Sequence, residues 1–77
     1  MYNLLDTVVL TRDVPHAGLR RGDLGVIVEV YGPNAFDVEF VAASGRTQAL
    51  VTLSADDLRH VDDDDLISVR TLEQATG

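Results

Sequence analysis

Short runs of β-branched and apolar residues, separated by polar turns, run through most of the chain and predict an all-β fold. The clearest alternation is in residues 36–40, where Phe36, Val38 and Phe40 alternate with Asp37 and Glu39. A period of two is typical of a strand with one buried face. A shift of one residue would expose two phenylalanines and bury two carboxylates. The phenylalanine row is therefore predicted to face the core.

The same pattern predicts four more strands, at residues 7–11, 24–31, 47–53 and 58–61. In residues 24–31 one row of side chains includes Glu29, which marks that row as the more solvated. The opposite row is then the more buried one, and it consists of Val26, Val28 and Val30.

The facing of residues 47–53 stays open, because three apolar side chains of one row compete with Leu50 alone in the other. Three glycines are predicted to be structural turn positions, where a residue without a side chain is favoured: Gly22, Gly25 and Gly45. Gly22 and Gly25 together are predicted to mark a turn and a close approach of strands. Ser54 is placed to cap a short helical turn over residues 54–57, just before the last of the five strands. Residues 66–70 again have strand character, and they form either an extra edge strand or a partly ordered arm. Residues 71–77 are expected to be frayed.

Five short antiparallel strands, a long first loop and a helical turn before the last strand resemble the small SH3-like barrel. We therefore predict an SH3-like barrel over residues 1–61. Residues 62–77 are predicted to form an acidic C-terminal extension. If this extension is ordered, it consists of an edge strand followed by a frayed tail.

A narrower resemblance rests on five segments of the chain: LLDTVVL at residues 4–10, RGDLGVIVEVY at 21–31, VEFV at 38–41, TQALVTL at 47–53 and LRHV at 58–61. Together they resemble a family of small bacterial proteins known only as a domain of unknown function. The resemblance covers residues 4–61 and extends more loosely to residue 70. That family offers no catalytic residues to transfer, and its small open reading frames are compatible with antitoxin or immunity-type roles.

Residues 22–30 also resemble the ribosome-associated KOW motif, in which a basic residue and glycines precede a Val/Ile strand. KOW modules on RNA are usually basic, whereas this segment is surrounded by acids such as Asp23, Glu29 and Asp37. The shared pattern is better explained by shared barrel geometry than by RNA binding.

Charge and composition narrow the choice of partners. The chain has 77 residues, a formal net charge of −7 and no cysteine. The last sixteen residues hold five acids and one arginine, which is more than half of the net charge. Such a field repels nucleic acid and anionic membranes. The absence of cysteine and of any apolar run of membrane-spanning length favours the cytoplasm.

No catalytic constellation is visible in the sequence. His16 and His60 are the only imidazoles; carboxylates could complete a zinc site with them, but nothing in the spacing suggests one. No serine lies at a strand-to-helix elbow. The tripeptide at residues 21–23 reads as a turn with flanking charges, since so short a motif occurs often by chance. Arg12, Arg20 and Arg21 would form an anion site only if the loops brought them together. We therefore expect no catalytic residue, no cofactor and no metal.

The remaining features suggest a non-enzymatic protein-binding module. An acidic run, Asp62, Asp63, Asp64 and Asp65, would steer a basic partner, and Tyr31 and Leu50 would anchor it. The same run would otherwise be a solvated segment that protects a sheet edge, or, less favoured, a metal-binding one. The most specific form of the hypothesis is an antitoxin or immunity-like inhibitor. The alternatives are a KOW-like nucleic-acid or ribosome-associated module and a self-associating domain.

Overall fold

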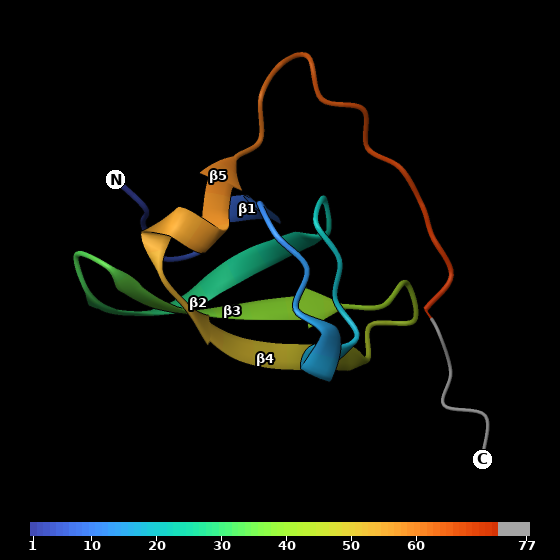
Figure 1. The fold of residues 1–77 in the computed structure, drawn as a ribbon, viewed down its shortest axis with the longest axis horizontal. Coiled ribbons are helices and arrows are strands. Elements are labelled where there is room, and N and C mark those ends of the chain that lie inside the picture. The colour runs from blue at the N-terminus through green and yellow to red at the C-terminus, as the bar shows by residue number, and fades with distance from the viewer. Residues whose placement is uncertain (73–77) are drawn as a thin grey trace.

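The computed structural model describes residues 1–72, which form one antiparallel sheet of five strands (Figure 1). The strands are β1 (Thr7–Leu10), β2 (Leu24–Gly32), β3 (Ala35–Val41), β4 (Thr47–Leu53) and β5 (Leu58–His60). Their order in the sheet is β4-β3-β2-β1-β5, so β1 lies between β2 and the last strand. The prediction of an all-β domain of about five antiparallel strands is confirmed.

Two short 3-10 segments interrupt the strands, η1 (Pro15–Ala17) and η2 (Ala55–Asp57). η2 is the helical turn predicted before the last strand. The carboxylate of Asp57 accepts hydrogen bonds from the backbone N–H of Ser54 at 3.0 Å and from its hydroxyl at 3.2 Å. These bonds close the turn that redirects the chain from β4 into β5. Residues 1–72 contain no helix with the length and apolarity needed to cross a bilayer.

β3 supplies the centre of the core, as its alternation predicted. Phe36, Val38 and Phe40 are all buried, whereas Asp37 and Glu39 lie on the opposite, partly exposed face. The other buried members of this cluster are Val8, Leu10, Val14, Leu19, Ile27, Leu53 and Leu58. Every strand therefore contributes at least one side chain to one apolar cluster.

The long loop between β1 and β2 also contributes to the core. Val14 and Leu19 are buried, and each donates its backbone N–H to the carbonyl of the other, at 3.0 and 3.1 Å. This pair closes the loop around η1, and Gly18 takes the left-handed conformation there (φ +70°). The loop is therefore packed against the sheet.

The predicted facing is wrong for the first half of β2, and a β-bulge is the reason. Ile27 is fully buried and pairs with Val38, but the next pair is Glu29 with Asp37, so Val28 is an extra residue in its strand. Because side chains alternate with a period of two, one inserted residue exchanges the faces of the strand. The first half of β2 thus buries its odd-numbered residues, and Val30 is partly exposed rather than a core residue.

The structure decides the facing of β4 that the sequence left open. Leu53 is buried and Ala49 and Val51 pack against the core, whereas Leu50 is exposed. The reason is that β4 is paired with β3, and these three residues lie opposite the buried side of that strand.

Of the turn and the close strand approach predicted for Gly22 and Gly25, the structure has the close approach, and not a turn, at Gly25. It lies inside β2, opposite Val8, and a Cβ atom there would be 2.6 Å from Cγ1 of Val38 and 2.7 Å from Cε2 of Phe40. Its role is to let β2 approach the core side chains of β3. Gly22 and Gly45 do lie in turns, with φ of +94° and +89°.

Residues 62–72, here called the C-terminal arm, contain no strand, so the extra edge strand considered for residues 66–70 is absent. A turn closed by the bond from Asp65 N to Asp62 O (3.0 Å) directs the chain away from the sheet edge before residue 66. The arm then arches over one end of the sheet (Figure 1). The frayed tail expected at the C-terminus lies, from residue 73 onward, outside the described residues.

Candidate functional site

The outward surface of β2, β3 and β4 carries three carboxylates in neighbouring positions. Glu29 pairs in register with Asp37, and Asp37 pairs with Thr52 of β4. One step along the strands, Glu39 pairs with Leu50. We call this surface the acidic face and define it by Glu29, Tyr31, Asp37, Glu39, Thr47, Leu50 and Thr52.

Hydroxyl groups hold two of the carboxylates in place. Asp37 accepts hydrogen bonds from Oγ1 of Thr52 at 2.5 Å and from Oη of Tyr31 at 2.6 Å. Glu39 accepts one from Oγ1 of Thr47 at 2.5 Å. All these donors are neutral, so the negative charge of the carboxylates is retained.

The hydrogen bonds at Asp37 shift the titration of both partners. Donation from Thr52, followed by donation from Tyr31, lowers the pKa of the Asp37 carboxyl below its ordinary value. The bond to Asp37 in turn raises the pKa of the Tyr31 phenol. Both shifts favour an ionised carboxylate beside a protonated phenol at neutral pH.

The two predicted anchor residues both lie on this face. The Tyr31 side chain is 61% exposed and Leu50 is 59% exposed, and they flank the carboxylates of β3 from β2 and β4. The surface thus combines exposed apolar contact area with negative charge, and of its residue types tyrosine is one that is enriched at protein interfaces.

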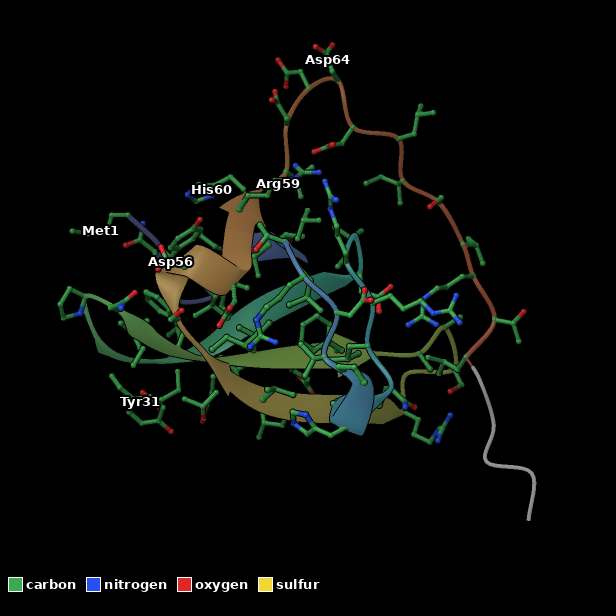
Figure 2. All side chains as sticks on the ribbon, viewed as in Figure 1. Met1, Tyr31, Asp56, Arg59, His60 and Asp64 are labelled. Carbon is green, nitrogen blue, oxygen red and sulfur yellow. The ribbon has the colours of Figure 1, made fainter. Side chains whose placement is uncertain are left out.

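The structure does not bring the predicted aspartate run to the anchors. Figure 2 shows Tyr31 and Asp64 on opposite sides of the molecule, separated by the sheet. Asp65 is turned back onto the domain, where it accepts two hydrogen bonds from the Arg59 guanidinium at 2.7 and 2.9 Å. The hydrogen bonds from Arg59, with one from the backbone of Asp62, lower the pKa of Asp65 to about 2. Asp64 and Tyr31 therefore do not share one surface.

The C-terminal arm and the sheet enclose an open groove of about 630 Å³. Val9, Leu24 and Val41 line it from the sheet, and Ile67 and Val69 line it from the arm. Two ion pairs fasten the arm beside this groove, Arg59 to Asp65 and Arg70 to Asp23. The Arg70 guanidinium contacts both oxygens of Asp23, at 2.8 and 2.6 Å, and also donates to the carbonyl of Gly18 at 3.1 Å.

The two histidines singled out in the sequence lie in different elements. His16 lies in η1, and His60 lies in β5, where its ring stacks on Tyr2 with 4.5 Å between ring centroids. Arg12 is bound to Asp57 at 2.6 Å, and the backbone N–H of Arg21 donates to the carboxylate of Asp13 at 2.8 Å. Within residues 1–72 no group of three or more His, Asp or Glu side chains is arranged to hold a metal ion.

Sequence reasoning missed that Glu29, Asp37 and Glu39 lie together on one surface of the sheet. The signal was present, since the alternation in residues 36–40 places Asp37 and Glu39 on the face opposite the phenylalanines. Their juxtaposition with Glu29 depends on the bulge in β2, which the alternation of the separate strands does not reveal.

Comparison with known proteins identifies the domain but no activity. No curated protein and no solved structure matches the chain significantly. A family profile does match, over residues 4–60, and its description is "Domain of unknown function (DUF4926)". The matched region spans all five strands and ends with β5. The chain therefore belongs to the DUF4926 family of domains of unknown function.

Proposed function

We propose that this protein is a non-enzymatic binding module that uses its acidic face to hold a basic protein partner. The observation that carries the proposal is the position of Glu29, Asp37 and Glu39 on one sheet surface, between the exposed side chains of Tyr31 and Leu50. No ion pair from residues 1–72 reaches these three carboxylates. Their charge is available to lysine or arginine side chains of a partner.

The rigidity of the surface also supports binding. Asp37 and Glu39 are held by threonine and tyrosine hydroxyls, so they lose little conformational freedom when a partner binds. The face is part of a sheet whose reverse side is the core of the domain, which keeps the spacing of its groups constant.

The finer form of the proposal is an inhibitor of antitoxin or immunity type in the bacterial cytoplasm, built on an SH3-like barrel. The strand order supports such a barrel, because β1 lies between β2 and β5 and a 3-10 turn leads into β5. A small acidic domain suits an inhibitor that covers the basic surface of an effector, since opposite charges accelerate the encounter.

The KOW-like alternative predicts binding to RNA with a steep dependence on salt. The acidic face opposes it, because three carboxylates on the sheet would repel a phosphate backbone. A titration with RNA at low salt tests this alternative, and tight binding would reverse the ranking.

The proposal is tested with two variants that remove the same number of charges. One carries Glu29→Gln, Asp37→Asn and Glu39→Gln on the acidic face. The other carries Asp62→Asn, Asp63→Asn and Asp64→Asn on the C-terminal arm. Each variant is immobilised beside the wild type, and the basic proteins that it captures from a cell extract are quantified. The rates at which these proteins associate with each immobilised chain are then measured.

We expect the face variant to lose the captured basic proteins and to show a flatter salt dependence, while the arm variant behaves like the wild type. Equal losses in both variants would show that net charge alone drives capture, and the acidic face would then have no special role.

A further inference from the structure

The free edge of the sheet along β4 suggests how a partner docks. β4 is at one end of the strand order and, within residues 1–72, pairs only with β3. Its seven residues, TQALVTL, include no charge, proline or glycine. No backbone hydrogen bond from the described residues reaches its outer edge. An uncharged edge strand of this kind is a template for another strand.

The hydrogen-bond alternation identifies the outward backbone groups. The N–H of Ile27 donates to the carbonyl of Asp6 at 3.0 Å, so Ile27 directs its backbone groups toward β1. In an antiparallel ladder its register partner, Val38, must then direct its own groups toward β4. Val38 is paired there with Val51, whose groups are used inside the sheet. The neighbours of Val51 on either side therefore direct their N–H and carbonyl groups outward.

These neighbours are Leu50 and Thr52, and their side chains lie on the acidic face. A strand added at β4 would thus bond to the backbone of Leu50 and Thr52 and would extend the acidic face itself. Neighbouring strands lie about 4.8 Å apart, so alternate side chains of the added strand would contact those of β4 directly.

The charge beside this edge selects the occupant. Asp37 and Glu39 are bonded to Thr52 and Thr47 of β4 at 2.5 Å, so both carboxylates lean from β3 toward the free edge. A second copy of the chain, added through its own β4, would bring the same two carboxylates toward these. An extended segment with lysine or arginine at alternate positions would pair with them instead.

We propose that β4 is a docking edge for an extended segment of a basic partner. The segment adds to the sheet as a further strand and places alternate lysine or arginine side chains over Asp37 and Glu39. Backbone hydrogen bonds at Leu50 and Thr52 hold the segment, and the carboxylates select its charge. This inference rests on the proposed function, because it names the form in which the partner meets the acidic face.

The test uses a synthetic peptide as long as β4, with blocked ends, in which lysine alternates with valine. Two comparison peptides carry N-methyl groups on all the lysines or on all the valines, which leaves the charge unchanged and removes one set of backbone donors. A fourth peptide has glutamate in place of lysine. Affinities for the full chain are measured by calorimetry, and amide shifts and protection by NMR.

We expect the parent peptide to bind, the glutamate peptide not to bind, and one of the two N-methylated peptides to lose affinity by about tenfold or more. Loss with methylated lysines indicates antiparallel addition, and loss with methylated valines indicates parallel addition. The amides of Leu50 and Thr52 gain protection from exchange on binding. In the protein, Leu50→Pro removes one outward N–H, and we expect it to lower the affinity for the parent peptide by a similar factor. Proline is tolerated on an edge strand where the N–H points away from the sheet, so the fold should be kept.

Equal affinity of the parent and both N-methylated peptides would overturn docking at β4 and leave the acidic face intact. A third outcome separates charge from strand addition. The Leu50→Pro variant would bind the parent and the N-methylated peptides equally, while the variant lacking the three carboxylates would bind the parent peptide as tightly as the wild type does. This outcome would overturn the charge argument and leave strand addition intact. The proposal would also be overturned if the parent peptide did not bind. It would likewise be overturned if the wild-type chain formed dimers and Leu50→Pro abolished them, because the edge would then bind a second copy.

Discussion

Gly25 of β2 lies directly against Phe40 of β3, so close that a Cβ atom on Gly25 would be 2.7 Å from Cε2 of that ring. Cγ1 of Val38 is equally near, at 2.6 Å. Both neighbours are buried, so neither side chain has free volume to move into. The packing of β2 on β3 thus depends on a missing side chain at this position.

Replacement of Gly25 by alanine should therefore destabilise the domain. We expect Gly25→Ala to lower the free energy of unfolding by about 1–3 kcal/mol, the usual cost of forcing one extra carbon into a packed core. Urea unfolding followed by circular dichroism measures the change. Gly45→Ala is a useful comparison, because nothing lies within 4 Å of a Cβ there and its cost is one of backbone conformation only. Unchanged stability of Gly25→Ala would contradict the close approach.

The bulge in β2 determines which of its side chains contribute most to the stability of the domain. Ile27→Ala should cost about 2–5 kcal/mol of unfolding free energy, because it leaves a cavity in the core. Val30→Ala should cost less than about 1 kcal/mol, since this side chain is partly exposed. Urea denaturation of the two variants compares the costs. Similar values for both would favour the unbroken valine row expected from the sequence.

The ion pair between Arg59 and Asp65 predicts how the arm responds to acid. The pKa of Asp65 is lowered to about 2 by Arg59 and the backbone of Asp62, whereas an unperturbed aspartate titrates near ~3.9. A lowered folded-state pKa means that the pair stabilises the arm above about pH 4 and that this contribution is lost as the pH falls toward about 2. Carbonyl-detected NMR titration of Asp65 measures it. In Arg59→Ala we expect the pKa to return toward its ordinary value; no change would show that Arg59 does not hold this carboxylate.

The two hydroxyl donors at Asp37 should not contribute equally. Thr52→Val and Tyr31→Phe each remove one hydrogen bond to the carboxylate, so each should raise the pKa of Asp37 toward its ordinary value. Thr52 makes the larger contribution, and we expect the larger rise in Thr52→Val. NMR titration of Asp37 in both variants checks the order. A larger effect of Tyr31→Phe would reverse the assignment of the dominant donor.

The ion pair between Arg70 and Asp23 gives a prediction about the other end of the arm. Arg70 contacts both oxygens of Asp23, and Arg70→Ala removes these bonds together with the one to the carbonyl of Gly18. We expect faster amide exchange in residues 66–72, with protection of the sheet unchanged, because the arm contributes no strand to it. Retained protection of the arm in this variant would show that apolar contacts, and not the ion pair, hold it.

Much of the fold follows from local patterns. The alternation of Phe36, Val38 and Phe40 predicts both the strand and its buried face, because only one register hides the rings and exposes the acids. The 3-10 turn before β5 follows from Ser54 and the acids after it, which satisfy the free N–H groups of the turn. These features depend on residues a few positions apart in the chain.

The errors have a common physical cause, because each depends on partners distant in sequence. Glu29 identified the solvated row of β2 only for its own half of the strand, since the bulge at Val28 is visible only in the pairing with β3. Gly25 reads as a turn residue until Val38 and Phe40 are seen to fill the space beside it.

The candidate site shows the same division. By itself the sequence determined that the domain is all-β, that its charge is negative and that Tyr31 and Leu50 are candidates for contact, because composition and side-chain period are properties of the chain alone. Only the tertiary structure decided which acids accompany them. Strand pairing places Glu29, Asp37 and Glu39 on one surface, while the Arg59 ion pair turns Asp65 back to the domain, away from that surface. The reason is that strand register and ion pairing join residues far apart in sequence, and these contacts are defined only once the chain has folded.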